Sequence, residues 1–168
     1  MATEEQLQNL HKLVWGFRAL VAEYWLTPEP EAALRYAFTE AGEAMDALLR
    51  EKRPTDRRNN DKDHDRLDEW ADCAIMLLTA LPEGYASWAT AVQVARGGAG
   101  SDARLGYRVA EHMINPLTSV ETTVAMIAVL PGMNLQTRVV DRLRRIMHKH
   151  VPPYRWGMAQ SFLDKAKV

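Results

Sequence analysis

FTEAGEAMDALLR at residues 38–50 and LDEWADCAIMLL at residues 67–78 decide the fold of this chain. In each stretch two carboxylates stand three residues apart, Glu40 with Glu43 and Glu69 with Asp72. Alanine and leucine recur around them at the spacing of an amphipathic helix. Residues three apart share a helix face, so we expect each helix to present two carboxylates side by side.

The polar stretch 53–64 separates the two helices and has the composition of a loop. A loop of this length allows the helices to pack as an antiparallel hairpin, with one carboxylate pair opposite the other. Four facing carboxylates repel one another unless a cation lies between them, and Mg²⁺ prefers oxygen ligands. The predicted ligands are Glu40, Glu43, Glu69 and Asp72, with Mn²⁺ able to replace Mg²⁺. The alternative is a solvated acidic face paired with Arg35, Arg50 and Arg66.

The rest of the chain also has helical patterns, so we expect an all-α fold, a helical bundle built on the hairpin. Asn115-Pro116 suits a cap and first helical position. The β-branched stretch 118–130 could form a strand, but no partner strand is visible, and a helix is preferred. The helices are expected from Glu4 to the prolines at 28 and 30, and at about 31–51, 65–81, 87–96, 102–114, 118–130 and 134–150.

Length and composition set limits on function. The chain has 168 residues, is 47% hydrophobic and 26% charged, and carries a net charge of −1, which favours one ordinary globular domain over residues 1–168. This charge offers no general argument for nucleic acid or membrane as a partner. Cys73 is the single cysteine, the N-terminus lacks the pattern of a secretion signal, and no apolar run reaches ~18 residues. We therefore expect a cytoplasmic location.

The carboxylate pattern resembles a known signature. Glu-x-x-Glu, followed after residues 44–68 by Glu-x-x-Asp, resembles the motif of the MazG-like all-α nucleoside triphosphate pyrophosphohydrolases. That superfamily includes dimeric dUTPases, dCTP pyrophosphatases and phosphoribosyl-ATP pyrophosphatase. Its motif usually opens with two adjacent glutamates, whereas Thr39 precedes Glu40 here. The stretch DEWAD at 68–72 resembles the phage-type dATP/dGTP diphosphohydrolase (MazZ) branch.

The resemblance covers a MazG-like core at about residues 7–95, whereas residues from about 97 to 168 match no part of it and are expected to form a C-terminal helical extension. It implies hydrolysis of a (deoxy)nucleoside triphosphate to the monophosphate and pyrophosphate, with dGTP and dATP favoured. A dUTP, dCTP or phosphoribosyl-ATP substrate is the alternative. The resemblance also implies a homodimer or homotetramer. Glu43 is chosen as both ligand and general base. A helical module that binds nucleotide or nucleic acid without catalysis stays open, although no nucleic-acid motif is present.

Several other residues have two interpretations. The cations Arg53, Arg57, Arg58 and Lys62 of the loop could close over a triphosphate or be solvated. Arg138, Arg142, Arg145 and Lys149 share one face of the late helix and could reach a phosphate, although a plain solvent face is the preferred interpretation. Trp15 could stack on a base or lie in the core. Cys73 is interpreted as a small buried residue, and His148 and His150 as surface residues.

Overall fold

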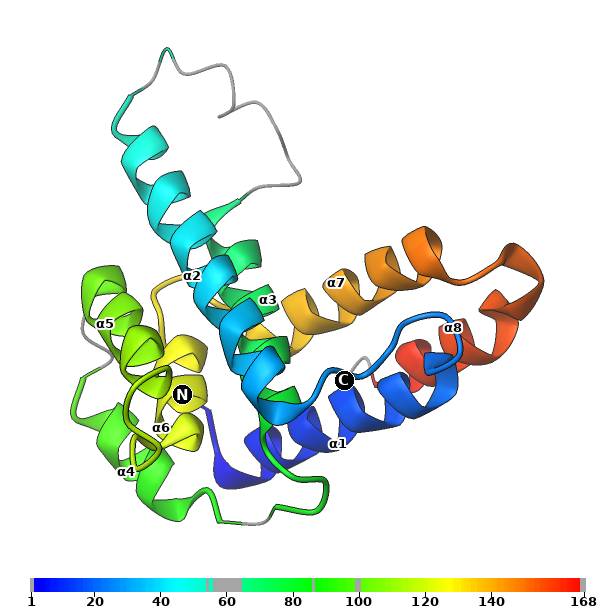
Figure 1. Cartoon of the computed structure of the whole chain (residues 1–168), viewed down its shortest axis with the longest axis horizontal. Coiled ribbons are helices and arrows are strands. Elements are labelled where there is room, and N and C mark those ends of the chain that lie inside the picture. Colours follow the sequence, from blue (N-terminus) through cyan, green and yellow to red (C-terminus); the bar gives the residue numbers. More distant parts are fainter. Residues whose placement is uncertain (1, 54, 56–64, 86, 99–100, 167–168) are drawn as a thin grey trace.

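The structure is a computed structural model and describes residues 2–53, 55, 65–85, 87–98 and 101–166. All regular structure within these residues is helical, which confirms the predicted all-α class (Figure 1). The elements are α1 (Glu4–Val21), α2 (Pro30–Glu51), α3 (Arg66–Ala80), α4 (Ala89–Arg96), α5 (Asp102–His112), α6 (Val120–Ala128), α7 (Leu135–His150), the 3₁₀ turn η3 (Pro153–Arg155) and α8 (Trp156–Lys165).

Local capping chemistry sets most helix starts. Thr3 forms a capping box with Gln6 at the start of α1, and Asp65 accepts a hydrogen bond from the Leu67 amide at the start of α3. Pro30 occupies the first turn of α2, where its missing N–H costs nothing. The stretch 118–130 contains a helix, as preferred, because it buries apolar side chains around nearly its whole circumference.

Two predicted boundaries are wrong. Asn115-Pro116 does not begin a helix, because the Asn115 side chain accepts from the Leu117 amide and its carbonyl from the Thr118 amide, closing a turn. Ser119 caps α6 instead. Helix α1 also ends at Val21, well before the prolines, and Trp25 donates its amide to the Val21 carbonyl in the turn that follows. Helix α8 was not predicted.

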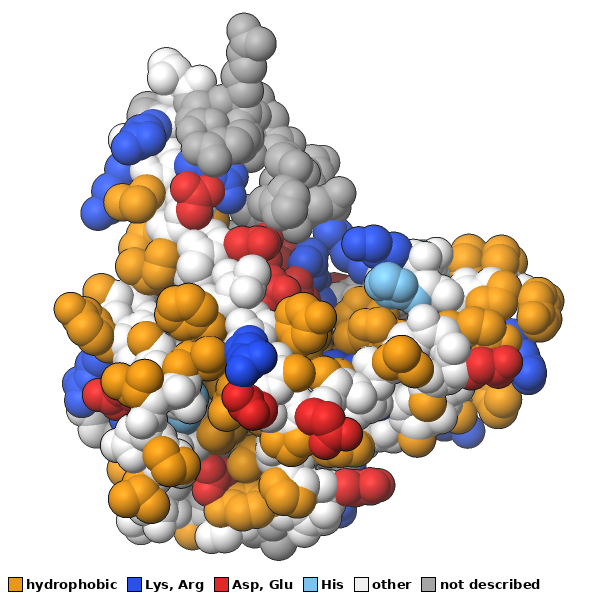
Figure 2. Space-filling view, in the orientation of Figure 1, with side chains coloured by type: hydrophobic (Ala, Val, Ile, Leu, Met, Phe, Trp, Pro, Cys, Tyr) orange, Lys and Arg blue, Asp and Glu red, His pale blue; other side chains and the backbone are white. Residues whose placement is uncertain are grey.

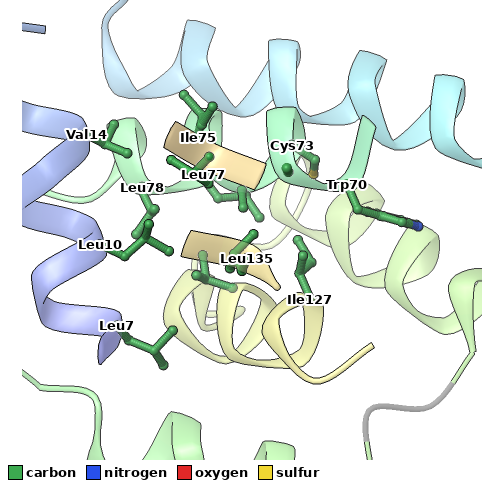
Figure 3. Close-up of a cluster of buried hydrophobic side chains, with 14 of the residues drawn as sticks. Leu7, Leu10, Val14, Trp70, Cys73, Ile75, Leu77, Leu78, Ile127 and Leu135 are labelled. Carbon is green, nitrogen blue, oxygen red and sulfur yellow. The ribbon is translucent and has the colours of Figure 1, made fainter. Parts of the chain in front are cut away.

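Helix α3 is the centre of the molecule. It lies beside α2, which runs in the opposite direction, and it also packs against α1, α6 and α7 (Figure 1). Residues on nearly every side of α3 are buried, with Trp70, Leu77 and Leu78 fully enclosed. Figure 3 shows side chains of α1, α6 and α7, including Leu10, Ile127 and Leu135, gathered with those of α3 in one core. Helices that follow residue 97 therefore share the core with those that precede it.

The C-terminal elements complete one side of the molecule. Helix α8 packs against α1 and α7. Gly16 permits this packing, because a Cβ there would lie 2.6 Å from the Phe162 ring. Helix α7 projects away from α2 and α3 on the same side as α1 (Figure 1), and its side chains line a cleft together with residues of α2 and α3. Among the described residues, none of the helices combines the length and apolar character needed to cross a membrane.

Candidate functional site

Three carboxylates from two helices converge at one point. Glu40 and Glu43 lie one turn apart on α2, and Glu69 faces them from α3. One oxygen from each lies within 4.8 Å of the others. Small side chains make this approach possible, since Ala41 and Ala44 of α2 are at most 3% exposed where the helix meets α3. We call Glu40, Glu43 and Glu69 the carboxylate triad.

The three side chains of the carboxylate triad differ in their exposure to solvent. Glu69 is 1% exposed, Glu40 is half-buried and Glu43 is exposed. Burial raises the pKa of Glu40 to about 8, and the nearby charges of Asp72, Glu43 and Glu69 add to this effect. Carboxylates held this close favour either a shared proton or a cation between them, and the all-oxygen donor set suits Mg²⁺ or Mn²⁺.

Asp72, the fourth predicted ligand, has a different environment. It lines the same cleft, but its two carboxylate oxygens each accept a hydrogen bond of 2.9 Å from Arg142 Nε, and Arg142 Nη2 also contacts Oδ2. Its pKa is raised by burial, against the opposing effect of Arg142. The structure therefore brings three of the four predicted ligands together and pairs the fourth with an arginine of α7.

The arginines of the predicted acidic-face alternative bind elsewhere. Arg35 pairs with Glu31, and Arg50 pairs with Asp46 one turn away on α2. Arg66 pairs with Asp102 at 2.8 Å and with Glu51 at 3.5 Å. These ion pairs join the three arginines to carboxylates other than those of the carboxylate triad.

A cleft of about 780 Å³ opens over the carboxylate triad. Its floor comes from α2 and α3, and the opposite wall comes from α7. Figure 2 shows acidic side chains meeting basic and histidine side chains in this hollow. The residues that line it are Trp25, Glu40, Glu43, Glu69, Asp72, Ile75, Met76, Arg142, Arg145, Ile146, His148, Lys149 and His150.

The interpretation of the basic face of α7 as a solvent face holds for Arg145 and Lys149, which are exposed, but not for Arg138 and Arg142, which pair with carboxylates of α3. Arg138 bridges Asp65 at 3.1 Å and Asp68 at 2.8 Å, which anchors the start of α7 to α3. Arg145 and Lys149 continue the same stripe into the cleft wall, one and two turns beyond the Asp72–Arg142 pair. His148 and His150 are exposed, as expected of surface residues, and line the same cleft. We call the five residues Arg142, Arg145, His148, Lys149 and His150 the basic wall.

Trp15 packs against α3 and does not line the cleft, which agrees with its interpretation as a core residue rather than a base-stacking one. Its indole N–H points to the end of α3 and donates to the Leu78 carbonyl at 3.2 Å and the Leu81 carbonyl at 3.1 Å. Trp25, which sequence reasoning missed, lies in the cleft wall instead. No local signal distinguished it, because Trp25 follows Val21 by four residues and continues the apolar stripe of the helix expected over this segment.

The remaining predicted residues divide into three groups. Arg53 is exposed just after α2 and does not line the cleft. Arg57, Arg58 and Lys62 lie outside the described residues. Cys73 is fully buried, and burial raises the pKa of its thiol, which confirms its interpretation as a core residue.

No family model, curated protein or solved structure matches this chain. Function is therefore inferred from the chemistry of the carboxylate triad and of the basic wall that faces it.

Proposed function

We propose that this chain is a Mg²⁺-dependent nucleoside triphosphate pyrophosphohydrolase of the MazG-like kind. One observation carries the proposal: three carboxylate oxygens within 4.8 Å of one another lie in the same cleft as the basic wall. A cation site alone has many uses, and a basic surface alone binds many anions. Together they suit a polyphosphate ligand that binds as a complex with a divalent metal ion.

The carboxylate triad would hold the metal, because its donors are hard anionic oxygens and Glu43 leaves one side open to solvent. When bound, Mg²⁺ supplies charge neutralisation of the phosphate oxygens and Lewis acidity. Arg145 and Lys149 bind the outer phosphates from the opposite wall. Arg145 suits this role because its planar guanidinium donates to two phosphate oxygens together.

The proposed reaction is attack of water on the α-phosphorus. A bond forms from the water oxygen to phosphorus, the bond from phosphorus to the α,β-bridging oxygen breaks, and pyrophosphate leaves. Glu43 accepts the proton of the attacking water. It is the member of the carboxylate triad in contact with solvent, whereas Glu69 is enclosed. The products are a nucleoside monophosphate and pyrophosphate, and purine deoxynucleotides are the favoured substrates.

A product analysis tests this function. The protein is incubated with Mg²⁺ and each canonical ribo- and deoxyribonucleoside triphosphate, and the products are separated by chromatography. Pyrophosphate with the monophosphate is the expected pair. Orthophosphate with the diphosphate means attack at the γ-phosphorus and overturns the assignment. Binding without turnover favours a non-catalytic nucleotide-binding module instead.

We also propose that a second copy of the chain covers an apolar groove between α2 and α5. The groove measures about 470 Å³ and is lined by Phe38, Thr39, Ala41, Gly42, Met45, Ala103, Gly106, Tyr107 and Ala110. Phe38 is 50% exposed and Tyr107 is 77% exposed, although both are large and largely apolar. Exposed apolar surface of this kind is typical of a subunit contact. A homodimer or homotetramer follows from this proposal.

A further inference from the structure

The apolar part of the cleft begins one helical turn beyond the Asp72–Arg142 pair. Met76 follows Asp72 by four residues on α3, and Ile146 follows Arg142 by four residues on α7. Ile75 and Trp25 complete this part. The floor of the cleft therefore changes along its length from the carboxylate triad to an apolar, aromatic surface, and the basic wall of α7 runs opposite both parts. A nucleotide has the same order, with charged phosphates and a flat base joined by a sugar.

Arg18 lies directly behind this apolar surface. Its guanidinium carbon is 3.7 Å from the centroid of the Trp25 ring, its Nε donates to Thr79 Oγ1 at 2.8 Å, and its Nη2 lies 3.6 Å from Met76 Sδ. The residue is 1% exposed, and Nη1 is buried with no hydrogen-bond partner among the described residues. Burial lowers the pKa of Arg18 to about 10, so the side chain stays charged at neutral pH.

Packing alone does not explain this arrangement. A buried guanidinium with an unused N–H and no carboxylate partner among the described residues destabilises a fold, and an apolar side chain of the same length would avoid that cost. What Arg18 does supply is a cation on one face of Trp25, which fixes the indole and withdraws electron density from it. A ring prepared in this way stacks well on an electron-rich aromatic system, and purines offer the largest such face among the nucleobases.

We infer that Trp25 is the stacking platform for the purine base of the substrate, and that Arg18 is the residue that positions it. The inference rests on the proposed function and adds the base subsite to it. The triphosphate then lies between the carboxylate triad and the basic wall. A volume of about 780 Å³ is in the range of sites that hold ligands of this size.

Two ligands separate base recognition from phosphate recognition. One is the α,β-imido analogue of dGTP, whose P–N–P bridge resists cleavage, and the other is inorganic tripolyphosphate, which has no base. Binding of each is measured in Mg²⁺ by isothermal titration calorimetry. Trp25→Leu is expected to weaken the dGTP analogue tenfold or more and to leave tripolyphosphate within twofold. Trp15→Leu is the matched control and should leave the ratio of the two affinities unchanged.

Arg18→Met supplies the second test. Removal of the buried charge should leave the melting temperature unchanged or raise it, and should weaken the dGTP analogue severalfold without affecting tripolyphosphate. A lower melting temperature with equal losses for both ligands would assign Arg18 a structural role and overturn its part in the inference.

The remaining outcomes distinguish the two proposals. If both ligands bind the unmodified protein and Trp25→Leu weakens them equally or not at all, the base platform is wrong and the pyrophosphohydrolase proposal stands. If neither ligand binds in Mg²⁺, the proposed function fails and the base platform fails with it. A dCTP analogue that binds as tightly as the dGTP analogue overturns the purine preference.

Discussion

Glu40 and Asp72 face the same cleft and burial raises the pKa of both carboxyl groups, but their charged neighbours differ. Glu40 has Glu43, Glu69 and Asp72 nearby, whereas Asp72 is bound by Arg142. In metal-free buffer the charge of Glu40 is therefore unfavourable, whereas Arg142 offsets part of the cost of burying the Asp72 charge. The two residues allow the site to be tested one carboxylate at a time.

The first prediction concerns pH. The folded protein holds the Glu40 proton more tightly than the unfolded chain does, with a pKa of about 8 against 4.5. The stability contributed by protonated Glu40 is fully present below pH 4.5 and is lost as pH rises through 8. In EDTA, unfolding free energy should fall by on the order of 2 kcal/mol across this window. Glu40→Gln should flatten the dependence of unfolding free energy on pH in this window, as measured by urea denaturation. An unchanged pH dependence would contradict the prediction.

The second prediction sets two amide substitutions against each other in EDTA at pH 8.5. Glu40→Gln removes a repelled charge and should raise the melting temperature. Asp72→Asn removes the carboxylate that Arg142 binds with two nitrogens and should lower stability by about 1–3 kcal/mol. Differential scanning calorimetry of both variants checks the signs. Shifts in the same direction would mean that the four carboxylates form one equivalent cluster.

The third prediction concerns the general base. Glu43→Gln keeps the shape of the side chain but removes both an anionic ligand and a proton acceptor, so the turnover rate should fall about a hundredfold or more. Glu31→Gln is the matched control, because Glu31 is an exposed glutamate in the first turn of the same helix and pairs with Arg35. Its rate should equal that of the unmodified protein. Glu43→Gln activity within threefold of that rate would exclude Glu43 as the base.

At the scale of elements, the close approach of α2 and α3 creates the carboxylate triad. Alanines of α2 form the contact. Ala44, which follows Glu40 by four residues, is completely buried. Ala44→Leu should push the helices apart and cost about 1–3 kcal/mol of stability, and it should also weaken Mn²⁺ binding measured by electron paramagnetic resonance. Gly42→Ala is the control on the same helix. A Cβ there meets nothing within 4 Å, so stability should rise by about 0.5–1 kcal/mol. Unchanged Mn²⁺ affinity in Ala44→Leu would show that metal binding does not depend on the close approach of α2 and α3.

At the scale of the whole molecule, the groove between α2 and α5 opens away from the core at residues that are large, apolar and exposed. Phe38→Glu with Tyr107→Glu should dissociate the assembly, because burial of two carboxylates in an apolar contact is unfavourable. Multi-angle light scattering at low micromolar concentration measures the change in mass. Leu117→Glu is the control, since Leu117 is 90% exposed in a turn outside the groove. A monomeric mass for the unmodified protein would refute the subunit contact.

The amino-acid sequence by itself determined the helices and the faces that they present. A 3.6-residue period, capping residues and the spacing of Glu40 and Glu43 are local, so they specify one side of one helix without reference to the rest of the chain. The all-α class and the burial of Cys73 followed from these patterns. Asn115-Pro116 shows the limit even of local chemistry, because the same two residues suit a turn as well as a helix start.

Only the tertiary structure decided which side chains meet across the cleft. Arg142 and Asp72 are 70 residues apart, and their contact depends on the direction that α7 takes after α6 at the turn Pro131-Gly132, where Gly132 has a φ of 77°. Trp15 and Trp25 have similar sequence environments, yet the Trp15 indole donates to carbonyls at the end of α3, whereas Trp25 lies in the cleft wall. The physical reason is that periodicity sets the direction of a side chain around its own axis, whereas the packing of several helices sets what lies opposite.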